Sequence, residues 1–203
     1  AWACSYNGSD PGSGIQEFVK TTNGGLTWIP YIDKIAVPGS SFGIGNISSL
    51  DANTAWAAIY PCTSTINGCG VYKTTNGGNT WTKQTTATQF TGTAAFPNLV
   101  HMFDLNNGFC MGDPNGGYFE VYTTSNGGLN WNRVSKLNLG NVTPVSGEYG
   151  TDNLYDAIGS SAWFGTSKGK VYRTTDKGQS WSAYTAVPTA KPIVAMAFNS
   201  VLN

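Results

Sequence analysis

The chain has 203 residues, and its eleven basic and eleven acidic side chains give a formal net charge of zero at pH 7. This balance, without any basic run, argues against nucleic acid and anionic membrane surfaces as partners. No apolar run approaches the roughly 20 residues that a membrane span needs. At this length we expect a single domain with a substantial buried core.

An eleven-residue phrase occurs four times and ends in tryptophan each time. The copies are FVKTTNGGLTW (18–28), VYKTTNGGNTW (71–81), VYTTSNGGLNW (121–131) and VYRTTDKGQSW (171–181). Successive closing tryptophans are 53, 50 and 50 residues apart. A fixed period of this length is typical of a chain built from copies of one unit, which stack to bury their apolar faces.

Each phrase predicts a β-hairpin. Its first half has side chains that alternate between the two faces of a strand, and the Asn-Gly-Gly that follows is the composition of a tight turn with positive φ. We expect the Asx side chain to bond backbone amides of the turn and the tryptophan to pack back over it. The expected structural residues are Asn23, Gly25, Trp28, Asn76, Gly78, Trp81, Asn126, Gly128, Trp131, Asp176, Gly178 and Trp181.

Two further segments recur upstream of each hairpin. One contains Ala-Trp or a similar pair, at 1–4, 55–58, 108–111 and 162–165; the other lies before it, at 47–51, 100–104, 155–159 and, last, 195–199. One repeat is therefore four strands, as a propeller blade requires. We predict an all-β propeller of four-stranded antiparallel blades, with repeats at about 1–45, 46–98, 99–152 and 153–192 and an inner strand of the next or first blade at 193–203.

The phrase Thr/Ser-x-Asn/Asp-x-Gly-x-Thr/Ser/Asn-Trp resembles the Asp-box, or BNR, repeat of β-propellers, although only Asp176 keeps the acid. Such propellers include sialidases, xyloglucan-cleaving endoglucanases, sortilin-type receptors and a photosystem II assembly factor. They usually have about six to eight blades, so the resemblance favours four blades of a larger ring. A closed four-bladed ring, sealed by pairing of the two chain ends, is the alternative.

Longer phrases, such as those at 101–108 and 111–122, look like secreted propellers of bacteroidete-type bacteria that are labelled glycosyl hydrolases or sialidase-like. A sialidase would need an arginine triad to hold a carboxylate. The chain has only Arg133 and Arg173, so we do not expect sialidase activity from these residues.

The cysteines and the low charge favour a secreted or cell-surface protein. Cys62 and Cys69 bracket a short loop, and a disulfide between them would suit an oxidising compartment; two unpaired thiols are the alternative. Cys4 and Cys110 lie on equivalent strands, where we expect buried, unpaired thiols.

Catalytic candidates are few. His101 and Asp156 fall at equivalent positions of neighbouring inner strands and could form an acid–base pair, or simply a structural hydrogen bond. Asp104 and Glu148 are carboxylates that a glycosidase could pair with Asp156. Asp113 lies in Gly-Asp-Pro, which indicates turn chemistry. We expect no cofactor and no metal, since no ligand cluster is evident.

The long connections into the inner strands are the most credible binding surface, because such loops gather on one face of a propeller. Their aromatic residues could stack on sugars or anchor a protein, or fold back as loop cores. These are Trp28, Tyr31, Phe42, Phe90, Phe96, Trp131 and Tyr149. We therefore expect a recognition or scaffold module for glycan or protein, with two alternatives: a glycoside hydrolase, and a structural subunit of a surface assembly or of a larger propeller.

Overall fold

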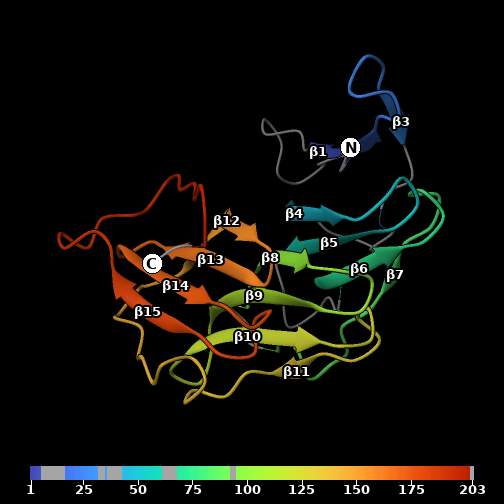
Figure 1. Cartoon of the computed structure of the whole chain (residues 1–203). Helices are drawn as coiled ribbons and strands as arrows, with labels where there is room; N and C mark the ends of the chain where they lie inside the picture. The colour runs from blue at the N-terminus through green and yellow to red at the C-terminus, as the bar shows by residue number, and fades with distance from the viewer. Residues whose placement is uncertain (6–16, 32–34, 36–42, 61–67, 92–94, 202–203) are drawn as a thin grey trace.

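The computed structural model describes residues 1–5, 17–31, 35, 43–60, 68–91 and 95–201. All the described elements are strands, and they form one three-stranded and three four-stranded antiparallel sheets. Figure 1 shows these sheets arranged as successive blades. The predicted all-β fold of propeller blades is confirmed. No helix in the described ranges is long and apolar enough to cross a bilayer.

Each sheet is one blade, numbered in chain order. Blade one contains β1 (Trp2–Ser5), β2 (Glu17–Lys20) and β3 (Ile29–Tyr31). Blade two contains β4 (Gly43–Ser49), β5 (Ala55–Tyr60), β6 (Gly70–Thr74) and β7 (Thr82–Lys83). Blade three contains β8 (Pro97–Met102), β9 (Gly108–Pro114), β10 (Phe119–Thr124) and β11 (Asn132–Arg133). Blade four contains β12 (Gly150–Ile158), β13 (Ser161–Thr166), β14 (Lys170–Thr174) and β15 (Ser182–Thr185).

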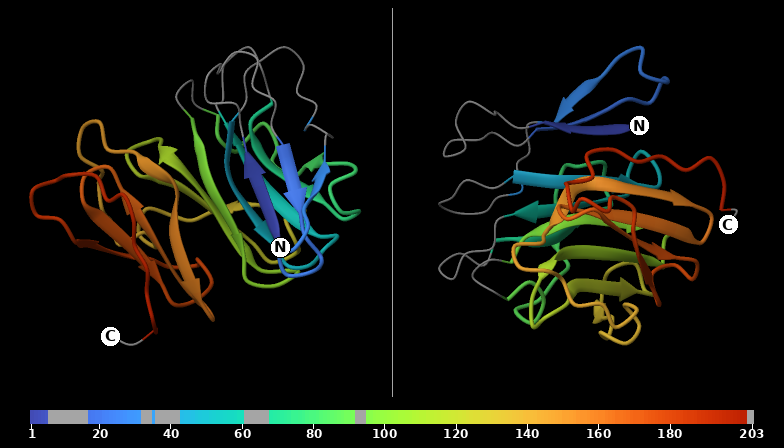
Figure 2. Two further views of the ribbon diagram at one scale, coloured as in Figure 1. Left: turned by 90° about the horizontal axis from the view of Figure 1, so that it is seen from above. Right: turned by 90° about the vertical axis from the view of Figure 1, so that its left-hand side faces the viewer.

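The blades fan out from their inner strands. β4, β8 and β12 are each the first strand of their sheet and pack against one another, and β1 packs against β4. Figure 2 shows blade one and blade four at the two ends of an open fan. The described residues therefore form part of a propeller, and the alternative of a closed four-bladed ring is wrong for them. The inner strands also begin two or three residues before the predicted repeat boundaries.

The segment from 193, expected to be an inner strand, contains no strand up to residue 201. It nevertheless lies against blade four. The N–H of Phe198 donates to Asp156 Oδ2 at 2.6 Å, and its ring stacks on Trp163 with centroids 4.1 Å apart. Because a side-chain carboxylate takes the N–H that a ladder would use, the segment covers β12 and β13 without joining their sheet.

The core lies between adjacent blades. Alternate residues of a strand point to opposite faces, and in blade three both faces are buried. Val100 and Cys110 pack toward blade two in one cluster, whereas Leu99 and Met111 pack toward blade four in the other. Blade three is thus sandwiched between its neighbours, which fixes its strands firmly in place.

The four hairpin turns share one hydrogen-bonded arrangement. A buried threonine hydroxyl donates to the Asx Oδ1 and accepts the N–H of the glycine two residues beyond the Asx. The Asx Oδ1 then accepts the N–H four residues after it. The threonines are Thr21, Thr74, Thr124 and Thr174. In the third turn Gly128 has φ of 92°, and a side chain there would also crowd the Trp56 indole, so glycine is required.

These turns also join the blades. Trp56 Nε1 of blade two and Lys73 Nζ above its ring both donate to the Gly127 carbonyl in the turn of blade three, each at 3.1 Å. Lys20 Nζ of blade one reaches the Gly77 carbonyl of blade two at 3.4 Å in the same way. One blade's indole and ammonium groups therefore satisfy carbonyl oxygens that the next blade's turn exposes.

The joint between blades three and four uses a different pair. Phe109 and Thr123 stand where blade two has Trp56 and Lys73, so blade three offers no donor there. Instead Lys177, which replaces the first glycine of the turn at φ 58°, donates to Asp104 Oδ2 of blade three at 2.7 Å. The fourth turn reads Asp-Lys-Gly and not Asn-Gly-Gly. At this joint the lysine therefore comes from the turn of blade four, whereas at the joint between blades two and three it comes from a strand of the preceding blade.

The closing tryptophans of blades two, three and four each pack on the blade before them. Trp81 stacks on Phe18 of blade one, and Trp181 meets Phe109 of blade three edge to face. Trp131 is buried in the cluster that holds Trp56. Trp28 of blade one is 45% exposed, because no earlier described blade covers it.

Substitution of Trp56 by Phe tests this joint. The variant keeps an aromatic ring but loses the buried indole donor, so we expect the free energy of unfolding to fall by about 2 kcal/mol. Urea denaturation measures this change. Trp28→Phe is the matched control and should alter stability by less than about 0.5 kcal/mol. Equal effects of the two substitutions would show that the joint contributes nothing.

Candidate functional site

His101 and Asp156 do not form an acid–base pair in this structure. The His101 ring lies among Phe103, Phe109 and Tyr155, and burial lowers its pKa to about 4, although the charge of Asp156 acts in the opposite direction. Both oxygens of Asp156 accept backbone N–H groups, from Ala157 at 2.8 Å and from Phe198 at 2.6 Å. A histidine that is neutral at pH 7 and not hydrogen-bonded to the carboxylate is poorly suited to general acid–base work.

Asp104 and Glu148 are engaged in structural contacts at separate places. Asp104 accepts the N–H groups of Asn106 and Asn107 in the β8–β9 turn and pairs with Lys177, which together lower its pKa. The Glu148 side chain is fully buried before β12, where Lys170 Nζ lies at 2.6 Å and Thr166 Oγ1 at 2.7 Å. Neither carboxylate is presented to a cleft with Asp156.

A different pair of carboxylates lines a pocket on the face where the long connections enter the inner strands. Asp113 on β9 and Asp152 on β12 flank Asn98 on β8, so three strands of two blades contribute. The pocket has a volume of about 360 Å³. It is lined by Phe96, Asn98, Asp113, Tyr149, Gly150, Thr151 and Asp152. We call it the acidic pocket.

Hydrogen bonds across the blade boundary fix this arrangement. Asn98 Nδ2 donates to the Gly150 carbonyl and to Asp152 Oδ1, both at 3.1 Å. The Gly150 N–H donates to Asp113 Oδ1 at 2.9 Å. Asp113 is therefore not part of the turn predicted from Gly-Asp-Pro: it lies in β9, and the positive-φ turn comes later, at Gly116 and Gly117.

The pocket is electrostatically negative. Burial raises the pKa of Asp113 to about 6, and the charges of Asp152 and Glu120 add to this effect, whereas hydrogen bonds from Gly150 and Asn98 oppose it. Burial of the carboxyl also raises the pKa of Asp152. No lysine or arginine forms an ion pair with either aspartate within the described ranges. In the described part of the chain, the site thus holds two carboxylates without an ion-pair partner.

The aromatic residues of the connections divide between surface and core. Tyr149 is 51% exposed at the edge of the acidic pocket, and Phe96 stacks on Tyr60 at 4.1 Å. Phe90 and Trp131 are buried as loop cores. Phe42 and the side chain of Tyr31 lie outside the described residues. Asp152 and Asn98 were not predicted from the sequence, although Asn recurs near the start of the inner segments, as Asn46, Asn98 and Asn153.

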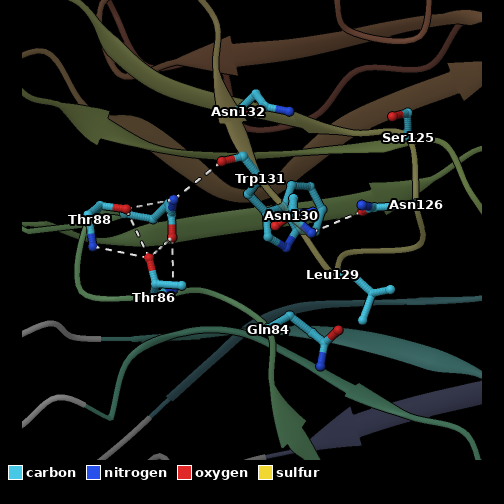
Figure 3. Close-up of a pocket in the computed structure, with 10 residues that line it drawn as sticks. Gln84, Thr86, Thr88, Ser125, Asn126, Leu129, Asn130, Trp131 and Asn132 are labelled. Atoms are coloured by element: carbon cyan, nitrogen blue, oxygen red, sulfur yellow. Dashed lines mark hydrogen bonds between the residues drawn. The ribbon is translucent and has the colours of Figure 1, made fainter.

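A second pocket, of about 380 Å³, lies between the segment after β7 and the turn of blade three, and Figure 3 shows how its side chains converge. Its lining is uncharged, with Gln84, Thr86, Thr88, Gln89, Ser125, Asn126, Leu129, Asn130, Trp131 and Asn132. Gln89 organises one wall, since its Oε1 accepts from Thr86 Oγ1 at 2.8 Å and its Nε2 donates to the Trp131 carbonyl at 3.3 Å. We call it the amide pocket.

Two cysteines are unpaired, as expected, but only one of them is fully buried. Cys110 is a buried free thiol and Cys4 is a half-buried free thiol. Cys69 is buried and is not among the free thiols. Cys62 lies outside the described residues, so its pairing with Cys69 stays a prediction.

The acidic pocket predicts a pH-dependent stability. The Asp113 pKa of about 6 in the folded state lies above the unfolded value of about 3.9. The folded state therefore binds more protons between these values, and stability falls as pH rises through that window. Asp113→Asn removes the ionisation but keeps an acceptor for Gly150, so we expect it to stabilise the protein by about 1–3 kcal/mol at pH 7.5.

At pH 4 the Asp113→Asn variant and the original protein should have nearly the same free energy of unfolding in urea. Asp51→Asn is the control, because Asp51 accepts turn N–H groups that lower its pKa and should give no gain at pH 7.5. A loss of stability in Asp113→Asn at pH 7.5 would contradict this account.

Comparison with known proteins identifies the fold and the family. YCF48 from Cyanidioschyzon merolae is 19% identical, with 98% of this chain and 63% of that chain covered and a TM-score of 0.56. The GH74 enzyme of Niastella koreensis is 20% identical, with 85% and 22% covered and a TM-score of 0.53. A structure titled "YCF48 bound to D1 peptide" is 26% identical, with 69% and 38% covered and a TM-score of 0.48. No curated protein matches the chain.

The chain spans less than two thirds of the length of each of these three structures. The likeness to the Cyanidioschyzon merolae and Niastella koreensis structures supports the propeller fold. Residues 65–193, in contrast, match a family model described as "Photosynthesis system II assembly factor YCF48". A family defined by photosystem II assembly contradicts the expectation of a secreted or cell-surface protein, which is wrong. Since the match covers more than half of the chain, the protein belongs to the photosystem II assembly factor YCF48 family of BNR-type β-propellers.

Proposed function

We propose that the protein is a protein-binding scaffold of the assembly-factor kind. The observation that carries this proposal is the family match over residues 65–193, which spans blades three and four and the outer part of blade two. An assembly factor must hold another polypeptide in a defined position, and a rigid repeat domain with a loop-bearing face is suited to that task.

The loop face of blades three and four supports a binding role. Tyr149 presents an exposed ring there, while its backbone is held by two hydrogen bonds with Ser167, each at 3.0 Å. An aromatic side chain on a fixed backbone makes a good anchor, because little conformational entropy is lost when a partner covers it. Such preorganisation is useful to a protein that binds and does not catalyse.

The hydrolase alternative has less support. His101, Asp104, Glu148 and Asp156, the candidates from sequence, are held in turns, ion pairs or backbone contacts. The GH74 enzymes that resemble this chain are at most 20% identical, which supports the shared fold and not a shared reaction. The resemblance to bacteroidete-type propellers labelled glycosyl hydrolases stays a prediction.

Glycan recognition is a second candidate, favoured by the amide pocket. Neutral amide and hydroxyl groups there surround Trp131, whose buried Nε1 has no partner among the described residues. Uncharged donors and acceptors next to an aromatic ring are suited to sugar hydroxyls. This role would use the rim between blades two and three and leave the acidic pocket unused.

Binding of the D1 peptide named in the YCF48 complex, measured by fluorescence anisotropy, tests the leading proposal. We expect a saturable complex that Tyr149→Ala weakens by about tenfold, the loss of one aromatic anchor. Tyr184→Ala is the matched control, since Tyr184 is similarly exposed on β15, and should leave the affinity unchanged.

A glycan array run with the same protein separates the two candidates. Binding of the peptide without binding of any glycan supports the scaffold. Glycan binding that is lost in Gln89→Ala, together with no peptide binding, would overturn the scaffold in favour of glycan recognition.

A further inference from the structure

We propose that the acidic pocket receives an arginine side chain of the partner polypeptide. This inference rests on the proposed scaffold function and names the group that the loop face recognises. Three independent features of the pocket carry it: uncompensated carboxylates, a buried acceptor without a donor, and aromatic walls.

The carboxylates come first. Asp113 is half-buried and Asp152 is exposed, and Asn98 lies close to both. Glu120 does not line the pocket and is only 1% exposed, but its charge acts on Asp113. Glu120 Oε1 accepts from the Tyr122 hydroxyl at 2.7 Å, while Oε2 has no partner in the described residues. Negative charge that is partly removed from water without a cation is costly, so this cost falls mainly on the half-buried Asp113, and a cationic ligand would offset it.

The unfilled acceptor is the second feature. Asn98 lines the pocket but is only 1% exposed, and its Nδ2 makes both of its hydrogen bonds to Gly150 and Asp152. Its Oδ1 has no donor in the described part of the chain, and neither has the hydroxyl of Thr151 beside it. A guanidinium group carries five N–H donors in a fixed fork, so one ligand can serve a carboxylate and a neighbouring acceptor together.

The walls favour arginine over a metal ion or a lysine. Phe96 and Tyr149 line the pocket, and a planar guanidinium stacks on aromatic faces more readily than a compact ammonium does. A calcium ion would need six to eight oxygen ligands. Here Asp113 Oδ1, Asp152 Oδ1 and the Gly150 carbonyl already accept hydrogen bonds, and the described residues contain no cluster of three metal-ligating side chains, so the pocket offers too few free oxygens for calcium.

The test is an NMR titration of the whole chain with Nα-acetyl-arginine amide. The Gly150 N–H is bonded to Asp113, so its resonance reports directly on the pocket. We expect saturable shifts at Gly150 and at the Asn98 side-chain amide, and no shifts with the citrulline analogue, which has the same shape without the charge. Equal shifts with citrulline, or none with the arginine probe, would overturn the proposal.

Variants and competition complete the test. Asp152→Asn should weaken binding of the arginine probe about tenfold, as expected for the loss of a charge-assisted contact, whereas Asp51→Asn removes the same charge elsewhere and should have no effect. Calcium binding that shifts Gly150 and excludes the arginine probe would show a metal site instead and contradict the proposal. D1 peptide binding that Asp152→Asn does not alter would leave the scaffold function intact and refute only this inference. Saturable arginine binding without any polypeptide partner would refute the scaffold function alone.

Discussion

The structure depends on how its four hairpin turns hold their shape and join neighbouring blades. In each turn a buried threonine hydroxyl bonds both the Asx side chain and a glycine N–H. In blades two to four the turn and the closing tryptophan also contact the preceding blade. At the joint between blades two and three, the Trp56 indole and the Lys73 ammonium group of blade two donate hydrogen bonds to the Gly127 carbonyl of blade three. A local turn motif thereby becomes the contact from which the propeller is assembled.

The candidate binding site depends on the same assembly. Asn98, Asp113 and Asp152 come from three strands in two blades, so the acidic pocket exists only because blades three and four are held in register. The ion pair of Lys177 with Asp104 and the burial of Leu99 and Met111 secure that boundary. Because the joints between blades stabilise the fold, the protein tolerates destabilising negative charge in the pocket, and a cationic ligand can bind to that charge.

Much of this fold could be predicted from the sequence because it repeats. A phrase that recurs with a fixed period predicts the hairpins and the order of strands in a blade. It also predicts the hydrogen bonds between the Asx side chain and the backbone of the turn. One expectation failed. The segment after 193 is not a strand, and the N–H of Phe198 donates to the Asp156 side chain and not to a neighbouring strand. The favoured interpretation, four blades of a larger ring, agrees with the open fan, whereas the closed-ring alternative does not; pairing of distant chain ends leaves no local signal in a sequence by which to choose between them.

The site was harder to predict than the fold. A pocket arises where side chains of different blades meet, and Asp152 has no repeated counterpart to mark it. Asp113 was assigned to a turn because Gly-Asp-Pro is common there, yet tertiary packing placed it in β9 against Gly150. Residues that recur served the architecture, as Asp51 and Asp104 do in equivalent turns. The residues that form the acidic pocket are mostly those that depart from the repeat.

The most direct test of the central claim is native-state hydrogen exchange at the turn glycines. If the turn and its joint hold the blades together, the N–H groups of Gly78, Gly128 and Gly178 should exchange only on global unfolding, because each is buried beneath the preceding blade. Gly25, whose turn carries the exposed Trp28, should exchange faster despite the same bond to threonine. Fast exchange at all four glycines would show that the turns do not help to hold neighbouring blades together and would contradict the account.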